Sequence, residues 1–253
     1  MTEHADETTF MGIERSVTGK WWRERANDER LATTIAQRFG VPEIVGRVMA
    51  ARGIDLDDAE SFLSPTLRDL MPDPSTLQDM DKAAARIADA IEAGEGIAVF
   101  GDYDVDGATS TALLKRFFRA IDVDVPVHIP DRMKEGYGPN APALLELQRK
   151  GAKLILTVDC GVTAYAPLQE ARDAGIDVIV VDHHAAEPEL PPAVAVVNPN
   201  RLADESGPGP PCAAGVAFLG CAAWLRELRN RGWLEKEGGH APDLRHWLDL
   251  VAL

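Results

Sequence analysis

Apolar runs and amphipathic stretches alternate along residues 79–230 of this chain. The amphipathic stretches repeat apolar positions at the spacing of a helix, whereas the apolar runs have the length of buried strands. The expected helices are 79–93, 109–120, 140–150, 164–174 and 213–230. The expected strands are 97–100, 123–129, 153–159, 177–182 and 193–197. This alternation predicts an α/β fold, in which helices flank a parallel sheet with right-handed crossovers.

The first 75 residues have a different pattern. Residues 28–39, 42–51 and 55–62 show helical periodicity, and Pro72 and Pro74 then mark a linker. We therefore expect residues 1–75 to form an N-terminal arm and a small helical segment. Residues 76–253 would form the α/β domain.

The chain ends on an apolar run from Trp247 to Leu253, with neither a capping residue nor a polar tail. Residues 231–242, just before it, are expected to form a loop. Because the run stops while it is still hydrophobic, we expect the chain to be truncated at its C-terminus.

Composition limits the possible functions. With 45% hydrophobic and 26% charged residues, the chain suits a soluble globular protein of one or two domains. The 41 acidic residues against 26 basic ones give a net charge of −15, which argues against a nucleic-acid-binding surface on this segment. No apolar run approaches the roughly 20 residues of a membrane span, and the polar, acidic start has no signal region. We expect a cytoplasmic protein with no membrane partner.

Three acids alternate directly after the first strand of the predicted sheet. They are Asp102, Asp104 and Asp106, in the segment Gly101–Gly107. In open α/β sheets, ligands bind at the carboxyl ends of the strands. Acids this close repel each other unless a cation lies between them. A solvated acidic loop, or a single aspartate capping the following helix at Gly107, would also explain this segment taken alone.

Two later strands also end in potential metal ligands. Asp159 ends one of them, and Asp182, His183 and His184 end the next. Because parallel strands deliver their carboxyl ends to one edge of the sheet, we expect these side chains to converge with the acidic segment. Carboxylate oxygens and imidazole nitrogens together suit Mn²⁺, with Zn²⁺ as an alternative. Cys160 is either a thiolate ligand or, more simply, a small buried residue at the end of its strand.

In their order along the chain, these segments resemble the DHH phosphoesterase superfamily, and within it the RecJ family of single-strand-specific 5′→3′ exonucleases. The matching segments are Gly101–Gly107, Arg132–Gly138, Val158–Gly161, Val181–His184, Pro211–Phe218 and Leu248–Leu253. The resemblance covers about residues 15–253 and implies a DHH-type sheet with ligands at its carboxyl edge. RecJ proteins continue into a second catalytic-side domain and a nucleic-acid-binding β-barrel domain, which we expect to be absent here.

The resemblance also implies roles for individual residues. Asp104 and Asp106 would each hold one of two divalent cations, Mn²⁺ or Mg²⁺, and Asp159 would bridge the two cations. The catalytic set would be Asp159, His183 and His184, with His183 binding one cation and His184 touching the scissile phosphate. The remaining implied roles are strand binding by Arg132 and Tyr137, support of the ligands from behind by Asp102 and Asp182, and completion of a coordination sphere by Asp249.

The implied activity is metal-dependent hydrolysis of phosphodiester bonds in single-stranded DNA, from 5′ to 3′, in DNA repair and recombination. The implied partners are single-stranded DNA, a single-strand-binding protein and a helicase. One alternative is a DHH phosphatase acting on small phosphoesters or short oligonucleotides. Another is a non-catalytic DNA-binding relative. The helical N-terminal segment and the segment Arg132–Gly138 favour the exonuclease over the phosphatase, and the complete ligand set favours an enzyme over a non-catalytic relative.

Overall fold

The computed structural model describes residues 15–22, 28–206, 212–236 and 241–252 of the 253-residue chain. Its contacts divide the chain into two compact units, Met1–Pro72 and Asp73–Leu253. The glycines and prolines of residues 207–211 predict a turn. This segment and most of the expected N-terminal arm lie outside the described residues. Within those that are described, no helix combines the length and the apolar content needed to cross a membrane.

The first unit is helical. Its helices are α1 (Glu29–Phe39), α2 (Glu43–Ala51), α3 (Ala59–Leu63) and α4 (Leu67–Leu70). Asp28 begins α1 by accepting the N–H of Leu31 at 2.8 Å. Ile35, Met49 and Ala59 form the buried centre of the unit. The third helix starts later than the predicted residue 55, because the Asp55 carboxylate accepts two backbone N–H groups and holds the chain in a turn before α3.

The second unit contains the predicted parallel sheet. The strands are β1 (Gly96–Gly101), β2 (Val127–His128), β3 (Ala152–Val158), β4 (Asp177–Val181) and β5 (Ala195–Val197). Their order across the described sheet is β2-β1-β3-β4-β5, and all the pairings are parallel. The α/β prediction with helices flanking a parallel sheet is therefore confirmed.

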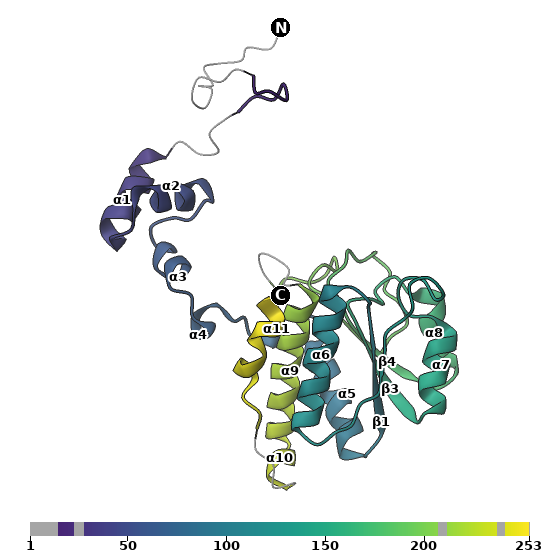
Figure 1. Ribbon diagram of the computed structural model, residues 1–253. Coiled ribbons are helices and arrows are strands. Elements are labelled where there is room, and N and C mark those ends of the chain that lie inside the picture. Colours follow the sequence, from purple (N-terminus) through teal and green to yellow (C-terminus); the bar gives the residue numbers. More distant parts are fainter. Residues whose placement is uncertain (1–14, 23–27, 207–211, 237–240, 253) are drawn as a thin grey trace. The chain divides into compact units, whose positions relative to one another are not determined.

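Helices cover both faces of this sheet (Figure 1). Those on one face are α5 (Met80–Glu92), α6 (Val105–Ala120) and α9 (Ala213–Asn230), and those on the other are α7 (Ala141–Arg149) and α8 (Tyr165–Asp173). The buried ring of Trp224 fixes α9 against α6, with its centroid 5.8 Å from that of Phe117 and 6.0 Å from that of Phe118. This packing sets where α9 begins relative to the strand ends.

Several boundaries differ from the sequence predictions. Helix α6 begins at Val105 rather than 109, because Asp104 caps it by accepting the N–H of Gly107 at 3.0 Å. Strand β2 is shorter than the predicted 123–129, since Pro126 and Pro130 cannot donate hydrogen bonds to a neighbouring strand. The expected loop at 231–242 contains a short helix. The remaining elements are η2 (Pro74–Thr76), α10 (Trp233–Lys236), η3 (Leu244–Trp247) and α11 (Leu248–Ala252).

Candidate metal centre

Three central strands deliver their carboxyl ends to one level of the sheet. Gly101 of β1 pairs in register with Val158 of β3, which pairs with Val181 of β4. The next residue on each strand is an aspartate: Asp102, Asp159 and Asp182. All three aspartates are buried, with at most 2% of their surface exposed. Strand register alone therefore places three carboxylates side by side.

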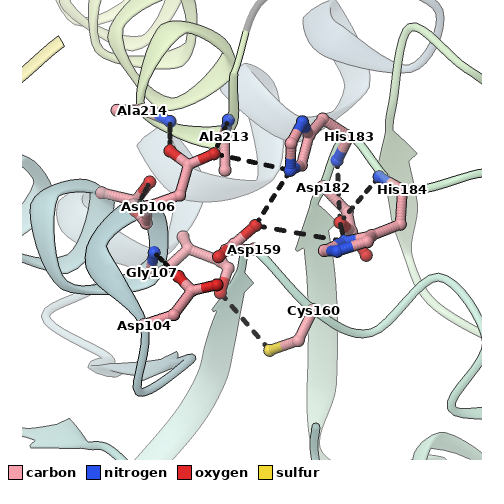
Figure 2. A network of polar contacts seen from close by, with 12 residues as sticks. Asp104, Asp106, Gly107, Asp159, Cys160, Asp182, His183, His184, Ala213 and Ala214 are labelled. Atoms are coloured by element: carbon pink, nitrogen blue, oxygen red, sulfur yellow. Dashed lines mark hydrogen bonds and ion pairs between the residues drawn. The ribbon is translucent and has the colours of Figure 1, made fainter. Parts of the chain in front are cut away.

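Two overlapping groups of potential ligands form at this edge (Figure 2). Within the described residues, one group contains Asp159, His183 and His184, and the other contains Asp102, Asp104 and Asp159. In each group the ligand atoms lie within 4.8 Å of one another. Asp159 belongs to both groups, so it occupies the centre of the arrangement.

Asp159 is held in an unfavourable environment. Its backbone has a left-handed φ of 60°, and its buried Oδ1 receives no hydrogen bond from any described residue. The Nε2 atom of His183 is 3.2 Å from this oxygen, close enough for an ion pair. Burial, followed by the charges of Asp104 and Asp106, raises the pKa of Asp159 to about 8. A cation bound to Oδ1 would supply the missing partner of this oxygen and would offset the repulsion from Asp104 and Asp106.

Asp104 and Asp106, by contrast, are each held by the N-terminus of a helix. Asp104 caps α6, whereas Asp106 accepts the N–H of Ala213 at 2.9 Å and that of Ala214 at 3.0 Å, both at the start of α9 (Figure 2). Helix N-termini carry partial positive charge, which stabilises these carboxylates. Each oxygen still has a lone pair that can face a cation.

Asp182 organises the two histidines. Its Oδ1 accepts the N–H of His183 at 2.7 Å and that of His184 at 3.2 Å. The same oxygen is 2.7 Å from Nδ1 of His184. With Nδ1–H directed at Asp182, Nε2 of His184 remains available to bind a cation or, when it carries a proton, to donate a hydrogen bond to a phosphate oxygen. The other oxygen of Asp182 accepts the N–H of Val162 at 3.1 Å, so the carboxylate itself is fixed.

Two asparagines in the segment after β5, neither of them a predicted site residue, support the same histidines. Asn198 donates from Nδ2 to the carbonyl of His184 at 2.9 Å, and Asn200 donates from Nδ2 to the carbonyl of His183. Asn198 is completely buried. Nothing in the local sequence indicates these contacts, because they join the end of β4 to the segment after β5.

The loop after β2 reaches the centre through Tyr137. Its Oη donates to the carbonyl of Asp159 at 3.2 Å and lies 3.4 Å from Nδ1 of His184. Burial raises the pKa of Tyr137, so the hydroxyl keeps its proton. Arg132, on the same loop, places its Cζ 5.3 Å from the ring centroid of Tyr103. Tyr103 was not among the predicted site residues.

The remaining predicted residues have different positions. Asp102 belongs to one candidate ligand group, its Oδ1 has no described hydrogen-bond partner, and burial raises its pKa. Its predicted place behind the ligands therefore stays a prediction. Asp249, in α11, accepts the N–H of Leu250 at 3.0 Å and belongs to neither ligand group of the described residues, so its role also stays a prediction. Cys160 is fully buried and donates from Sγ to the carbonyl of Val158, as expected for a small strand-end residue.

The donor set fits divalent cations. It combines several carboxylates with imidazole nitrogens, and buried Oδ1 atoms of Asp102 and Asp159 lack described donors. Fold and site together define an α/β protein with a candidate metal centre at the carboxyl edge of a parallel sheet. Residues 96–253 match the N-terminal domain of the DHH family. The chain belongs to the DHH family.

Several similar proteins are single-stranded-DNA-specific exonucleases named RecJ. The chain is 36% identical to RecJ of Bacillus subtilis (strain 168) over 208 residues, which are 82% of this chain and 26% of that protein. It is also 36% identical to RecJ of Escherichia coli (strain K12) over 215 residues, or 84% of this chain and 36% of that protein. The chain thus spans between 26% and 36% of the length of these two relatives.

Solved structures of RecJ are also similar to this chain. A crystal structure of exonuclease RecJ bound to manganese covers 70% of this chain at 39% identity, with a TM-score of 0.57, and the match takes in 42% of that chain. RecJ from Thermus thermophilus in complex with Mn²⁺ covers 89% at 30% identity, with a TM-score of 0.66, and 30% of that chain is matched. The fold of the described sheet and helices is therefore that of the corresponding part of RecJ.

Proposed function

We propose that this chain carries the metal-dependent phosphoesterase centre of a 5′→3′ exonuclease that degrades single-stranded DNA in repair and recombination. The observation that carries the proposal is the position of Asp159, a buried carboxylate shared by two groups of potential ligands. Such an arrangement is costly without cations and suits a centre that binds two of them. The names of the RecJ relatives supply the substrate class.

In this proposal, Asp104, Asp106, Asp159 and His183 hold two divalent cations, Mn²⁺ or Mg²⁺, and Asp102 lies within reach of the same site. Asp106 belongs to neither ligand group of the described residues, but its Oδ2 lies 3.5 Å from Nε2 of His183. The bound cations supply Lewis-acid activation of the phosphodiester and of water. The residues of the chain position the substrate. His184, oriented by Asp182, presents Nε2, which would donate a hydrogen bond to a phosphate oxygen when it carries a proton, and Tyr137 keeps a hydroxyl proton beside it.

The acidic composition is compatible with this activity. A carboxylate cluster repels a polyanionic strand, but cations held by the cluster offset the repulsion and attract phosphate. The objection raised by the net charge of −15 therefore applies to the rest of the surface and not to the centre itself. Binding of a long strand would depend on cationic side chains near the centre, of which Arg132 is one.

The test is an assay on strands labelled at either end, with Mn²⁺ or Mg²⁺ present. The protein should shorten single strands from the 5′ end, and Asp159→Ala should lower the rate by roughly 10³-fold or more, because the shared ligand is lost. Asp124→Ala is the matched control, since this exposed acid pairs only with Lys115 among the described residues. Undiminished cleavage by Asp159→Ala would contradict the assignment of the centre.

The same assay addresses the two alternatives. A phosphatase for small phosphoesters would cleave dinucleotides faster than long strands. A non-catalytic relative would cleave neither substrate, and calorimetric titration with Mn²⁺ would then show whether the centre binds metal at all. A single-strand-binding protein and a helicase as partners are parts of the proposal that rest on the RecJ resemblance alone. Action in the cytoplasm is a further part, and it rests on the sequence pattern described above together with that resemblance.

A further inference from the structure

Tyr103 lies at the edge of the metal centre and has no part in the proposed chemistry. It stands between Asp102 and Asp104, directly after β1, and its side chain is partly exposed. A tyrosine in the middle of an acidic segment contributes neither a ligand nor a helix cap here. Its surroundings indicate a different task.

A guanidinium group covers Tyr103. The Cζ of Arg132 is 5.3 Å from the ring centroid, within cation–π distance. The Arg132 side chain has no ion pair or hydrogen bond with any described residue, although acidic residues outnumber basic ones in this chain. The neighbouring Lys134, in contrast, pairs with Asp131 at 3.2 Å. Arg132 is thus a planar cation held against an aromatic ring, with its donors free.

Tyr137 connects this pair to the centre. Its ring meets that of Tyr103 edge to face, with centroids 6.5 Å apart and planes at 81°, and its hydroxyl reaches Asp159 and His184. Two neighbouring side chains are apolar and exposed, Val105 at 65% and Met133 at 90%. A planar, partly apolar surface with one cation therefore adjoins the candidate ligands.

We propose that Tyr103 and Arg132 form a stacking platform for a nucleobase of the strand whose phosphate occupies the metal centre; this inference rests on the proposed function. Guanidinium groups and aromatic rings both stack on base planes, and every base presents such a plane. The platform binds bases without selecting among them. Tyr103 is therefore a specificity residue that separates a nucleic-acid strand from phosphoesters lacking a base.

The experiment is an abasic scan. Affinity for a single strand is measured by fluorescence anisotropy in Mg²⁺, on strands whose first linkages are phosphorothioates to slow cleavage. Each nucleotide in turn is replaced by an abasic spacer. In the unmodified protein, one spacer position should weaken binding by about 5- to 150-fold, the range for one base–aromatic stack.

Two substitutions identify the platform as the cause. Tyr103→Leu should weaken binding of the normal strand by a similar factor and abolish the further loss at that spacer position. Tyr103→Phe should retain the full spacer penalty, because it keeps the ring. Leu202→Ala, which changes an exposed apolar side chain outside the platform, is the matched control and should behave as the unmodified protein.

The outcomes are distinguishable. If the unmodified protein binds strands but no spacer position matters, or if Tyr103→Leu keeps the whole penalty, the platform is overturned while the proposed function stands. If the unmodified protein binds no single strand, the proposed function fails and the platform fails with it. Because the penalty is a difference between two strands on one protein, a partial loss of folded protein in Tyr103→Leu does not change it.

Discussion

Charged residues are paired at the amino end of the parallel sheet, whereas buried acids at its carboxyl end lack lysine and arginine partners within the described part of the chain. At the amino end, Arg86 donates from Nε to Asp177 and from Nη2 to Glu95, both at 2.7 Å. At the carboxyl end, the buried Asp102 and Asp159 have no lysine or arginine partner among the described residues, and histidine nitrogens lie within 4.0 Å of Asp159 instead.

The pKa values follow this division. Burial lowers the pKa of Arg86, but its hydrogen bonds to Asp177 and Glu95 outweigh this effect, and the net shift is upward. At the other end, burial raises the pKa of Asp102 and of Asp159, the latter to about 8. At the amino end, ion pairs neutralise the charges and stabilise the fold. At the carboxyl end, the carboxylates have no such partner among the residues described, and a bound cation would neutralise them. Variants at either end can test this contrast.

The largest expected effect concerns pH and stability without metal. Below about pH 4, Asp159 is protonated in both the folded and the unfolded chain and contributes no pH dependence. As the pH rises toward about 8, only the unfolded chain ionises, so the free energy of unfolding should fall. In a chelator, Asp159→Asn should therefore raise the melting temperature at pH 8–9 by about 5–10 °C, with little effect near pH 4.

Melting curves in a chelator at several pH values provide this measurement. Asp177→Asn is the control, since it changes a paired acid at the amino end of the sheet, and its stability should still fall as the pH rises toward 8. Equal pH slopes for Asp159→Asn and the unmodified protein would show that Asp159 is not the strained acid.

A smaller effect is expected from the residue behind the histidines. Asp182→Asn replaces the carboxylate that fixes His184 and both histidine N–H groups. Loss of such an orienting group weakens metal binding by about 10- to 100-fold. Calorimetric titration with Mn²⁺ measures the change. Unaltered affinity in a folded Asp182→Asn protein would mean that the histidines are held by Asn198 and Asn200 alone.

The smallest effect is expected at the amino end. Arg86→Met leaves two acids without their shared partner and should lower the free energy of unfolding by about 1–2 kcal/mol, without changing the affinity for Mn²⁺. Denaturant melts measure the first quantity and calorimetry the second. Arg119→Met, at an exposed arginine with no described ion pair, should change neither. A loss of metal affinity in Arg86→Met would contradict the separation of the two ends.

Much of this centre could be predicted from local patterns. Apolar runs ending in Asp102, Asp159 and Asp182 sufficed, because parallel strands in register bring their ends to one level. The contacts that were not predicted are long-range ones: Arg132 meets Tyr103 across 29 positions of the chain, and Asn198 meets His184 across 14. These depend on how loops and helices pack over the sheet edge, and periodicity contains no information about that.

The start of α6 shows a more local limitation. The sequence after β1 predicts an acidic segment, with cation binding and helix capping as competing explanations. In the structure, Asp104 both caps α6 and lies in a candidate ligand group. The two explanations describe different lone pairs of one carboxylate, and a sequence pattern cannot separate them.

Asp106 has a consequence for how relatives of this chain are interpreted. Its carboxylate fastens the start of α9 to the start of α6 through Ala213 and Ala214, across more than 100 positions of the chain. Replacing Asp106 would therefore weaken the attachment of α9 to α6 as well as remove a candidate metal ligand. A descendant that had abandoned catalysis would still be under selection to keep an acceptor there, so an aspartate at this position is no proof of an active enzyme.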